Sequence, residues 1–554
     1  MCRARSWAAA AVGAAVMIGA GCEMLRFPTQ MPGPPTAVPE SIDAPRRVAR
    51  LSYLEGAVSL RVAGTREWAP AFLNRPLTDG DELWTEARGR AELDLGSVAL
   101  QLDARTSFGI LDLDDRSAQF KITQGKAAIL LRRLDAGDTF EIDTPNAAIS
   151  LLRAGNYRVD VDAGRDLTSI TVRAGTAHVA TLKETYTLYA PQQAIAAGTD
   201  TGTYRLAPAP EADAFDAFSG TRDRCEQAAR TSLYVSPDAI GSYELDAYGA
   251  WRTESVWGPV WTPREVPAGW APFRFGRWLW IEPWGWSWTD DAPWGFVTSH
   301  YGRWAFLGGR WSWLPGPRHV QPAYTPAAVM FLDGENRSSR SFLKPPSPGR
   351  DFVWMGRTEL AWFPLGPSEA YVPPYRCTHG YLTDINVTNT TIADPLALPT
   401  IDVARQKYVN QGVPGAATAV TRETFVGGGA VGRAAVMVPA GTAAATNVAG
   451  TTPSVSPAPC SLSPGMASRA PQPPEAAQNR QVLVWRVPIP APLPFERIER
   501  LRRGQPGGRP LDRARLDQLR RMEPSPRPDV RPVKPNPPGA AQGELPELQQ
   551  QRRE

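Results

Sequence analysis

Histidine and cysteine are both scarce in this chain. It holds 4 histidines and 5 cysteines among 554 residues, and no two cysteines stand in a CxxC spacing. Histidine is the side chain used most often as a general acid or base and as a metal ligand. The composition leaves little material for either chemistry, so we expect no metal, no cofactor and no catalytic residues.

The apolar run at the N-terminus is too short to cross a membrane. Arg3 and Arg5 precede apolar and small residues from Trp7 to Ala20, whereas a spanning helix needs ~20 such residues. A positively charged start followed by a run of this length is typical of a secretory signal peptide. We therefore expect residues 1–21 to direct export of the chain.

Small residues, Gly19-Ala20-Gly21, stand directly before Cys22. This arrangement resembles a bacterial lipobox, with the large apolar residue, Ile18, one place early. The resemblance implies that Cys22 is acylated and becomes the mature N-terminus of an outer-membrane or periplasmic lipoprotein. The acyl chains would hold it on a membrane, because each buried methylene contributes ~0.8 kcal/mol. Ordinary cleavage with secretion, and an uncleaved anchor, are the alternatives.

Positive charge is concentrated at the C-terminal end. The chain has 60 Lys and Arg against 56 Asp and Glu, and Phe495–Glu554 holds 14 of the basic and 9 of the acidic residues. The rest therefore has 46 basic and 47 acidic residues, a net charge of −1. Arginine-rich segments can bind nucleic acid, but an exported chain meets anionic lipid headgroups and cell-wall polymer instead. We expect no nucleic-acid partner.

The cysteines after Cys22 are far apart in the sequence. In an oxidising compartment, where disulfides form and persist, Cys225 and Cys377 could pair and leave Cys460 in a loose segment. Lone thiols at all of these positions are the alternative.

Alternating apolar residues begin at Val48, after a polar, Pro-rich stretch (residues 22–47) that we expect to be an extended tether. In Arg90–Asp103 every second residue on each side of a Gly-Ser turn is apolar, which predicts a β-hairpin. Further alternating runs follow, with short turns between them. We therefore expect an all-β domain over residues 48–203. The further runs are Thr139–Asp143, Asn156–Asp162 and Leu167–Arg173.

These strands resemble the FecR-type periplasmic domain. The resemblance rests on "LTDGDELWTEARGRAELDLGSVALQLDARTSFGIL" (Leu77–Leu111), "QFKITQGKAAI" (Gln119–Ile129), "FEIDTPNAAISLLRAGNYRVDV" (Phe140–Val161) and "ITVRAGTAHV" (Ile170–Val179), in the order of the family. It implies an all-β fold associated with signal sensing at the cell envelope. Regulators of this type also carry a cytosolic segment that engages a sigma factor. This chain starts with an export signal, so we do not expect that role.

Residues 204–245 are expected to connect two domains and to contain one helix. Between Glu211 and Arg230, Phe215, Phe218 and Cys225 lie on one helical face. That spacing predicts a helix that packs on a single neighbour.

Thirteen of the 19 tryptophans fall within residues 251–313, where the sequence repeats itself. "YGAW" (Tyr248–Trp251), "FGRW" (Phe275–Trp278) and "YGRW" (Tyr301–Trp304) recur at intervals of 27 and 26 residues. A Gly/Pro turn and a second tryptophan cluster follow each motif, so the repeating unit is a β-hairpin. We expect a Trp-rich domain over residues 246–392, built on three consecutive hairpins.

Two interpretations of these tryptophans are open. Each indole buries ~150–250 Å², so the indoles can supply the core of a thin sheet. Alternatively, one face of the hairpins is exposed and grips the flat faces of sugar rings in envelope polysaccharide, since exposed apolar patches mark binding sites. The candidate ligand-binding residues are Trp278, Trp280, Trp284, Trp286, Trp288, Trp304, Trp311 and Trp313.

The succession of the two domains resembles a family of bacterial envelope lipoproteins with an uncharacterised Trp-rich domain. The resemblance runs from about Val48 to Thr391. It is strongest in "YVSPDAIGSYELDAYGAWR" (Tyr234–Arg252), in the hairpin region Gly269–Pro317 and in "WFPLGPSEAYVPPY" (Trp362–Tyr375). It implies this architecture and brings no known activity.

Four residues suggest catalysis or metal binding but have a plainer interpretation. Asp290 and Asp291 are adjacent, so on a strand they point to opposite faces, whereas a glycoside hydrolase needs two carboxyls that flank one bond. His300 and His319 have no second ligand two or four residues away. We expect a turn at the two aspartates and no metal at the histidines.

Two short motifs are also expected to be structural. "DLDD" (Asp112–Asp115) lacks the additional oxygen ligands that calcium needs. "VGGGAVGR" (Val426–Arg433) contains GxGxxG, but a proline follows too soon for the helix that a dinucleotide site requires.

From about Asp394 the composition is low in complexity and then rich in Pro and Arg. We expect a linker over residues 393–493 and a basic, disordered tail over residues 494–554. Pro494–Arg503 and Arg513–Met522 could form short helices within the tail.

The sequence thus predicts a mainly β, exported, lipid-anchored protein with a disordered C-terminal region. Its predicted function is non-enzymatic binding or scaffolding at the cell envelope, on cell-wall or exported polysaccharide. A protein–protein role, sensing or assembling an envelope complex, is the main alternative, and a glycoside hydrolase is a distant one.

Overall fold

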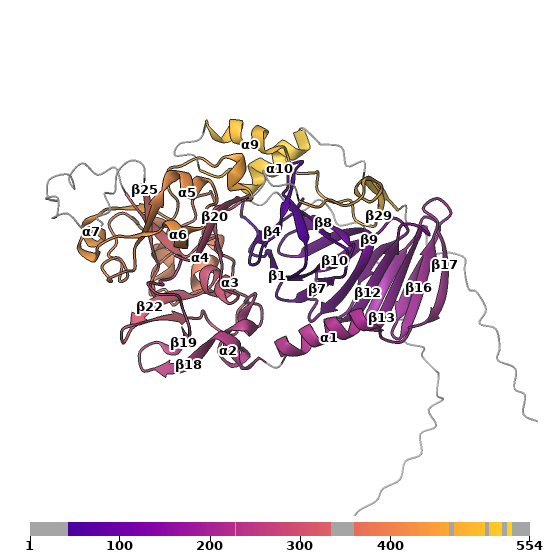
Figure 1. The fold of residues 1–554 in the computed structure, drawn as a ribbon, viewed down its shortest axis with the longest axis horizontal. Helices are drawn as coiled ribbons and strands as arrows, with labels where there is room; N and C mark the ends of the chain where they lie inside the picture. The colour runs from indigo at the N-terminus through magenta and orange to yellow at the C-terminus, as the bar shows by residue number, and fades with distance from the viewer. Residues whose placement is uncertain are drawn as a thin grey trace, which may run out of the picture. The chain divides into compact units, whose positions relative to one another are not determined.

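The structure, a computed structural model, describes residues 42–227, 229–333, 359–464, 470–504, 509–522 and 529–533. All of them belong to one compact unit, residues 40–554. The structure is mainly β (Figure 1). Among the described helices, none combines the length and the apolar character that a membrane crossing requires. The predicted signal peptide, Cys22 and most of the tether lie outside the described residues.

The first seventeen strands form the β domain, and β9 belongs to both of its sheets. The first half of β9 pairs with β8 and β10, and its second half pairs with β7 and β12. Apolar side chains of both sheets form one core. The strands are β1 (Ala49–Glu55), β2 (Val58–Arg61), β3 (Trp68–Pro70), β4 (Pro76–Leu77), β5 (Glu82–Thr85), β6 (Arg90–Asp94), β7 (Val98–Leu102), β8 (Ser107–Leu113), β9 (Ser117–Leu131), β10 (Thr139–Asp143), β11 (Ala148–Leu151), β12 (Gly155–Asp162), β13 (Leu167–Ala174), β14 (Thr176–Ala180), β15 (Thr185–Tyr189), β16 (Gln192–Ala197) and β17 (Thr203–Pro208).

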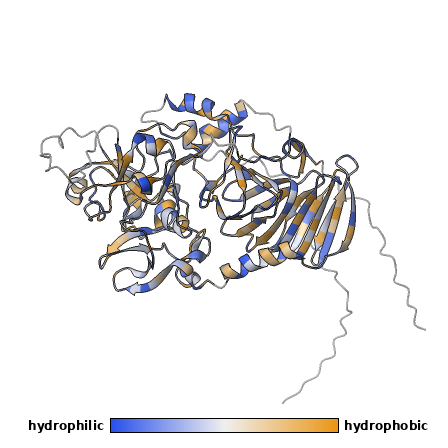
Figure 2. Ribbon diagram, viewed as in Figure 1, coloured by the Kyte–Doolittle hydropathy of each residue, from blue (hydrophilic) through white to orange (hydrophobic). Residues whose placement is uncertain are grey.

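The strands predicted from alternation are confirmed. β6 and β7 form the expected hairpin, with Ala91 opposite Leu102 and Leu93 opposite Leu100, and all four side chains are buried. The other predicted runs coincide with β10 or lie within β12 and β13. Figure 2 shows hydrophobic and hydrophilic residues alternating along these strands.

The end of the predicted tether belongs to the folded unit. The Arg46 guanidinium lies 2.8 Å from the Asp384 carboxylate, and Arg47 Nε donates to the carbonyl of Asp114 at 2.9 Å. The tether prediction is wrong for residues 42–47, because their polar groups bond to residues far away in the sequence.

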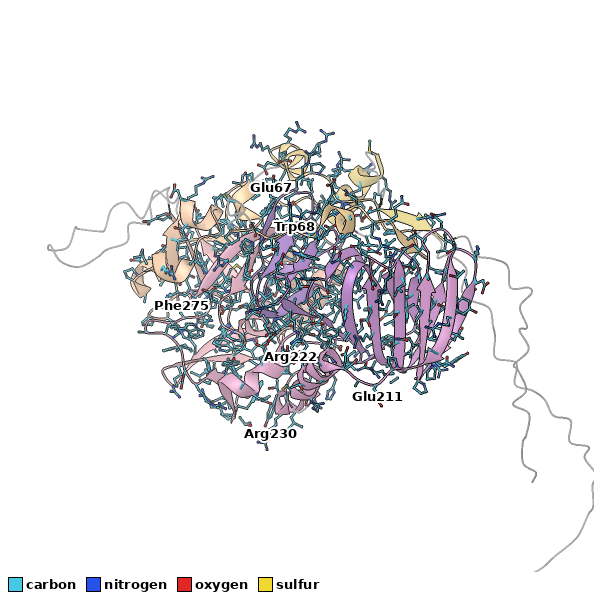
Figure 3. The ribbon with its side chains drawn as sticks, turned by 45° about the vertical axis from the view of Figure 1, so that its right-hand side comes forward. Glu67, Trp68, Glu211, Arg222, Arg230 and Phe275 are labelled. Atoms are coloured by element: carbon cyan, nitrogen blue, oxygen red, sulfur yellow. The ribbon has the colours of Figure 1, made fainter. Side chains whose placement is uncertain are left out.

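The helix predicted between Glu211 and Arg230 is α1 (Ala214–Gln227). Phe215 is buried, and the ring of Phe218 lies 5.7 Å from that of Tyr53 on β1. Arg222 donates two hydrogen bonds to the buried Glu92, at 2.9 and 3.0 Å, which hold the helix on the β domain (Figure 3). The connector also contains η1 (Arg230–Leu233), η2 (Ser242–Glu244) and α2 (Leu245–Tyr248).

Three β-hairpins follow, as the repeat predicted, but they divide between two sheets. The first and third hairpins form one four-stranded sheet in the order β18-β19-β23-β22, and the second stands alone. A short helix, α3 (Gly295–His300), separates the second hairpin from the third. The hairpin strands are β18 (Gly249–Glu254), β19 (Gly258–Pro263), β20 (Gly276–Ile281), β21 (Gly285–Asp290), β22 (Arg303–Leu307) and β23 (Arg310–Leu314).

A five-stranded sheet in the order β27-β26-β25-β24-β28 takes three of its strands from the predicted linker. The linker prediction differs here because the backbone groups of β26 and β28 pair with those of β25 and β24. The strands are β24 (Val329–Leu332), β25 (Glu359–Pro364), β26 (Thr418–Thr421), β27 (Val436–Met437) and β28 (Val448–Gly450). The helices of this region are α4 (His379–Val387), η4 (Pro395–Thr400), α5 (Arg422–Val426), α6 (Val431–Ala434), α7 (Ala440–Ala445) and η5 (Pro459–Ser461).

The described residues after 470 also pack on the unit. Both helices predicted in the tail are present, and the backbone N–H of Leu483 donates to the carbonyl of Thr144 in the β domain at 2.9 Å. The described part of the tail is therefore ordered, although disorder was predicted there. Residues 534–554 lie outside the described residues. The elements are α8 (Glu475–Gln478), β29 (Val482–Val484), α9 (Phe495–Arg502), α10 (Arg513–Met522) and β30 (Val530–Pro532).

Candidate functional site

A row of tryptophans crosses the four-stranded sheet. Trp251 lies opposite Trp261, and Trp261 lies opposite Trp313. Trp313 in turn lies opposite Trp304. Directly opposed residues share one face of a sheet, so the repeat places one indole from each strand on the same face. Trp294, just before α3, covers this row, with its ring centroid 5.0 Å from that of Trp261.

The second hairpin brings two further indole pairs together. Trp278 lies opposite Trp288 and Trp280 opposite Trp286, with ring centroids 5.4 and 5.6 Å apart and the rings edge to face. Pairs in this geometry contribute ~0.5–1.5 kcal/mol beyond their buried area. The sequence placed each strand's tryptophans on one face, and the register confirms it.

Aromatic side chains from later elements cover the second hairpin. The ring of Trp278 lies 5.2 Å from Phe331 of β24 and 5.4 Å from Trp362 of β25. Phe425 of α5 stacks on it at 5.3 Å. The aromatic cluster is therefore shared between the hairpin and the five-stranded sheet.

The eight tryptophans predicted to bind a ligand are all buried, and none exposes more than 8% of its surface. Of the two interpretations, the core is confirmed and the exposed indole face is wrong, because other elements of the unit cover these hairpins. The buried tryptophans are Trp278, Trp280, Trp284, Trp286, Trp288, Trp304, Trp311 and Trp313.

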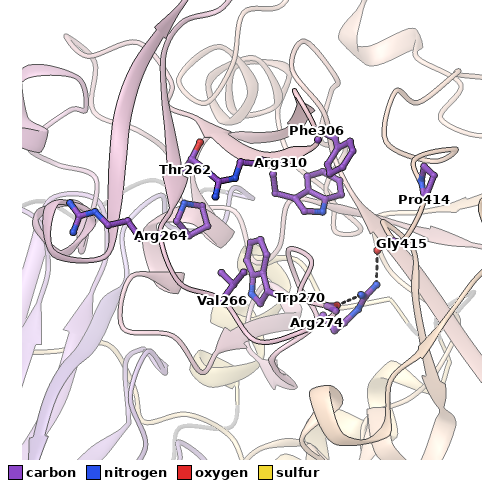
Figure 4. Close-up of a pocket in the computed structure, with 13 residues that line it drawn as sticks. Thr262, Arg264, Val266, Trp270, Arg274, Phe306, Arg310, Pro414 and Gly415 are labelled. Atoms are coloured by element: carbon purple, nitrogen blue, oxygen red, sulfur yellow. Dashed lines mark hydrogen bonds between the residues drawn. The ribbon is translucent and has the colours of Figure 1, made fainter.

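One edge of this aromatic core stays open, as a pocket of about 340 Å³ (Figure 4). Trp270 joins the pocket to the core, since its ring lies 5.6 Å from Trp294 and 5.5 Å from Trp304. Phe306 and Trp311, opposite each other on β22 and β23, form a second aromatic side, and Phe306 is 39% exposed. Three aromatic side chains therefore line the pocket.

Arg274 lies buried beside the pocket and is held by uncharged acceptors. Its Nη2 donates to the carbonyls of Gly415 at 2.7 Å and Ala417 at 3.2 Å (Figure 4). Its Nε donates to Thr418 Oγ1 at 3.0 Å, and its Nη1 donates to the carbonyl of Gly269. Burial lowers the pKa of Arg274 to about 10, so the guanidinium stays protonated at neutral pH.

Two further arginines line the pocket. Arg310 on β23 is exposed, and its side chain makes no hydrogen bond or ion pair within the described part of the chain. The Arg264 guanidinium donates to the carbonyls of Ala247 at 3.2 Å and Asp246 at 3.3 Å. No Asp or Glu stands among the described residues that line the pocket. The remaining lining residues are Thr262, Pro263, Val266, Gly269, Gly309, Pro414 and Gly415.

Asp290 is buried at the end of β21, and both of its carboxyl oxygens accept hydrogen bonds. Oδ2 accepts from Trp288 Nε1 and Oδ1 from the backbone N–H of Ala292, both at 2.9 Å. Burial raises the pKa of Asp290 to about 7. Asp291 is exposed and lies 3.5 Å from Arg277. Neither carboxyl lines the pocket.

Neither histidine belongs to a group of possible metal ligands among the described residues. His300 is buried, with Nδ1 2.7 Å from the carbonyl of Thr325, and burial lowers its pKa to about 3. His319 is exposed. Among the described residues, no group of His, Cys, Asp and Glu could hold a metal ion.

The two short motifs are structural. Asp112 is buried and Ser117 Oγ donates to its Oδ2 at 2.9 Å, while Asp115 accepts from the backbone N–H of Arg46 at 2.6 Å. The glycine-rich stretch Val426–Arg433 runs into α6, a helix of 4 residues.

The predicted disulfide between Cys225 and Cys377 does not form, and Cys460 is free as well. α1 turns Phe215 to the β domain and leaves Cys225 exposed. Cys377 is half-buried next to α4, and burial raises the pKa of its thiol to about 11. The two thiols therefore lie in different surroundings, and the lone-thiol alternative holds.

Of the residues that line the pocket, Trp311 alone was predicted from the sequence to bind a ligand. Trp270 falls between two repeats, so the repeat pattern does not include it. Arg310 stands directly before Trp311, and the tryptophan was predicted to bind a ligand while the arginine was not. The repeat shows which residues share a face, but not which end of a sheet stays uncovered. Pro414 and Gly415 come from the predicted linker, where composition gave no sign of a site.

Comparisons with known proteins give a family match and distant structural matches. Residues 242–369 match the model of a family of unknown function, DUF6600. No curated protein matches the chain. Two crystal structures of a candidate anti-sigma factor from Parabacteroides distasonis ATCC 8503 are 17% and 16% identical, with TM-scores of 0.21 and 0.22. The matches cover 23% and 31% of this chain, and 59% and 94% of the two solved chains.

Proposed function

We propose that this chain is a non-enzymatic binding protein of the bacterial cell envelope, and that its pocket takes a saccharide. The observation that carries the proposal is the open edge of the aromatic core, where Trp270, Phe306 and Trp311 line one pocket. Within the proposal Trp311 and its two pocket neighbours contact the ligand, and the other buried tryptophans are scaffold.

An aromatic pocket of this size suits one or two sugar rings. Ligand sites are concave, mostly apolar, and typically ~300–1,000 Å³ in volume, and this pocket of about 340 Å³ lies at the lower end. The C–H faces of a sugar ring can pack on an indole or phenyl ring while its hydroxyl groups remain in water. A longer polysaccharide could continue beyond the pocket, because the site is open to solvent at Phe306.

The residues that line the pocket support ligand binding without catalysis. No carboxylate, imidazole or thiol lines the pocket in the described part of the chain, and general acid–base catalysis needs a titratable group within hydrogen-bond reach of the reacting atoms. Asp290, the carboxyl that suggested a hydrolase, has no access to a ligand because it is buried and bonded to the core.

The sequence supports a location of this protein in the cell envelope. The N-terminal segment has the charge and length of an export signal, Cys22 stands where a lipobox cysteine would be acylated, and the β domain resembles a FecR-type domain. A Cys22→Ala variant tests the anchor by fractionation. It should leave the membrane fraction, and unchanged membrane partitioning would refute lipidation.

The binding role is tested by titrating the purified full chain with peptidoglycan fragments and with neutral and acidic polysaccharides. We expect at least one of them to bind, and Phe306→Ala to weaken that binding roughly 3- to 10-fold, the value of one aromatic contact. Trp257→Ala is the matched control, because this 41% exposed tryptophan lies outside the pocket. Equal effects of the two variants, or no binding of any polysaccharide, would rule out the proposal.

One observation favours a protein partner as a second candidate. At the turn between β18 and β19, Val256 is 77% exposed and Trp257 is 41% exposed, and a protruding apolar tip of this kind is typical of a protein contact. This role predicts that Trp257→Ala abolishes capture of an envelope protein that Phe306→Ala still captures.

A further inference from the structure

We propose that the saccharide bound in this pocket is acidic, a polymer of uronic acids whose ring carboxylates are bound by arginine. This inference rests on the proposed function and adds the charge of the ligand. It is carried by three arginines, Arg264, Arg274 and Arg310, which line the same pocket as the aromatic rings.

Arg274 is a buried cation, and the described residues around it supply hydrogen bonds but no negative charge. Other buried arginines differ in this respect. Arg50 lies 3.0 Å from Glu244 and Arg520 lies 2.6 Å from Asp79. A buried charge is costly unless it is paired, so an anion in the pocket would give Arg274 the counter-charge that its neighbours do not provide.

The pKa shift of Arg274 agrees with this geometry. Burial alone lowers it, whereas at Arg303 and Arg75, which are also buried, the nearby carboxylates of Glu369 and Asp81 act against burial. Among these three arginines, Arg274 is therefore the one that has no carboxylate nearby among the described residues.

Arg310 offers the accessible contact. It is exposed, its guanidinium carries five N–H donors, and its side chain makes no hydrogen bond or ion pair among the described residues. It lines the same pocket as Trp311, whose ring lies 5.3 Å from that of Phe306. A guanidinium and aromatic rings in one pocket match a uronic acid, because the carboxylate is attached at the edge of a sugar ring whose face packs on an aromatic side chain.

The charge around the pocket is consistent with this ligand. Arg264 adds a third cation, and its guanidinium is held by two backbone carbonyls. Glu265, next to it in the chain, is exposed and does not line the pocket. The lining thus has positive charge, aromatic surface and no competing carboxylate, which together favour a carboxylated sugar over a neutral one.

The test compares polygalacturonate with its fully methyl-esterified form, which keeps the sugar backbone and removes the charge. Alginate and hyaluronate are titrated in the same series, with dextran as the neutral polymer and phosphatidylglycerol vesicles as the non-saccharide anion. We expect a polyuronate to bind at least 10-fold more tightly than the ester or dextran, and the binding to weaken as salt rises from 50 to 200 mM, since salt screens exposed charges.

Arg310→Gln should weaken polyuronate binding roughly 10-fold or more, the value of a hydrogen bond to a charged group. Arg205→Gln is the matched control, because Arg205 is an exposed arginine on β17 in the β domain. Its binding should equal that of the unmodified chain.

The outcomes separate the two proposals. Equal binding of polyuronate, ester and dextran, or equal effects of Arg310→Gln and Arg205→Gln, would overturn the acidic ligand and leave the saccharide pocket standing. Binding of the anionic vesicles in place of every polysaccharide would overturn both, as would a failure of all polysaccharides to bind.

Discussion

At the scale of single residues, burial decides what each polar side chain can do. Asp290 suggested catalysis in the sequence, yet it accepts two hydrogen bonds from its own neighbourhood and lies in the core. Burial raises its pKa from 3.8 to about 7. Because the folded protein holds the proton more tightly than the unfolded chain does, this carboxyl links stability to pH.

Asp290 should make the protein less stable as pH rises. Its stabilising contribution is complete below pH 4, where both states are protonated, and is lost as pH rises through the folded pKa of about 7. The loss from this group is on the order of 4 kcal/mol. Urea unfolding at pH 4 to 8 should therefore show a smaller pH dependence in Asp290→Asn than in the unmodified chain.

Asp291→Asn is the matched control for this prediction. Asp291 is exposed and adjacent in the chain, so its variant should keep the pH dependence of the unmodified protein. If Asp290→Asn and Asp291→Asn gave the same slope, Asp290 would be ionised in the folded state and its buried position would be wrong.

Local spacing in the sequence predicted the face of a strand on which a residue lies, but not whether that face is buried. Alternation correctly placed Trp278 and Trp280 on one face of a strand. Their burial depends on partners such as Phe331, Trp362 and Phe425, which follow far later in the chain. No local pattern records such a contact, so the core and the exposed-face interpretations could not be separated from the sequence.

At the scale of elements, the second hairpin is stabilised by its aromatic contacts. Trp278→Ala removes a fully buried indole that touches four aromatic rings. We expect it to lower the free energy of unfolding by about 3–5 kcal/mol, the usual cost of a large aromatic-to-alanine cavity. Trp257→Ala, at an exposed turn, should change it by less than about 0.5 kcal/mol.

Chemical unfolding followed by far-UV circular dichroism measures both variants. A loss at Trp278 no larger than that at Trp257 would mean that the second hairpin is not covered by β24, β25 and α5.

The C-terminal helix α10 is attached to the β domain by a buried ion pair. Arg520 Nη1 lies 2.6 Å from the Asp79 carboxylate, and Arg513 lies 3.7 Å from it. Arg520→Gln should destabilise the protein by on the order of 2–3 kcal/mol, less than the cost of a fully unpaired buried charge because Arg513 remains. It should also speed tryptic cleavage within α10.

Arg515→Gln serves as the control on the same helix, because Arg515 is exposed and bonds to Gln518 within the helix. Cleavage of α10 at the same rate in both variants would contradict the docking of α10 through Asp79.

Elements whose apolar residues alternate or whose sequence repeats could be predicted from the sequence, and elements without such a pattern could not. The strands of the β domain and the three hairpins follow from alternation and repetition. The Ala-, Gly- and Thr-rich residues of β26 and β28 lack such a pattern, and they become ordered because β24 and β25 offer them backbone partners. Low complexity predicted a linker where the chain in fact supplies strands of the five-stranded sheet.

At the scale of the whole unit, polar contacts join the β domain to the Trp-rich domain. Asn74 Nδ2 donates to the carbonyls of Asp290 at 3.0 Å and Ala292 at 2.7 Å, and Arg50 Nη2 donates to the carbonyl of Pro293 at 2.8 Å. These contacts are buried or part-buried, so separating the domains would leave polar groups without partners. The β domain thus helps to keep the hairpin tryptophans covered.

The central claim is that the tryptophans are a core and that only their open edge meets a ligand. Hydroxyl-radical footprinting with mass spectrometry, with and without a polyuronate, tests it in one measurement. We predict labelling of Trp257, Trp270 and Phe306, protection of Trp270 and Phe306 alone when the polymer is added, and no labelling of Trp278 or Trp288 in either state. Labelling of Trp278 and Trp288 at the level of Trp257, or protection that bypasses Trp270 and Phe306, would contradict the account.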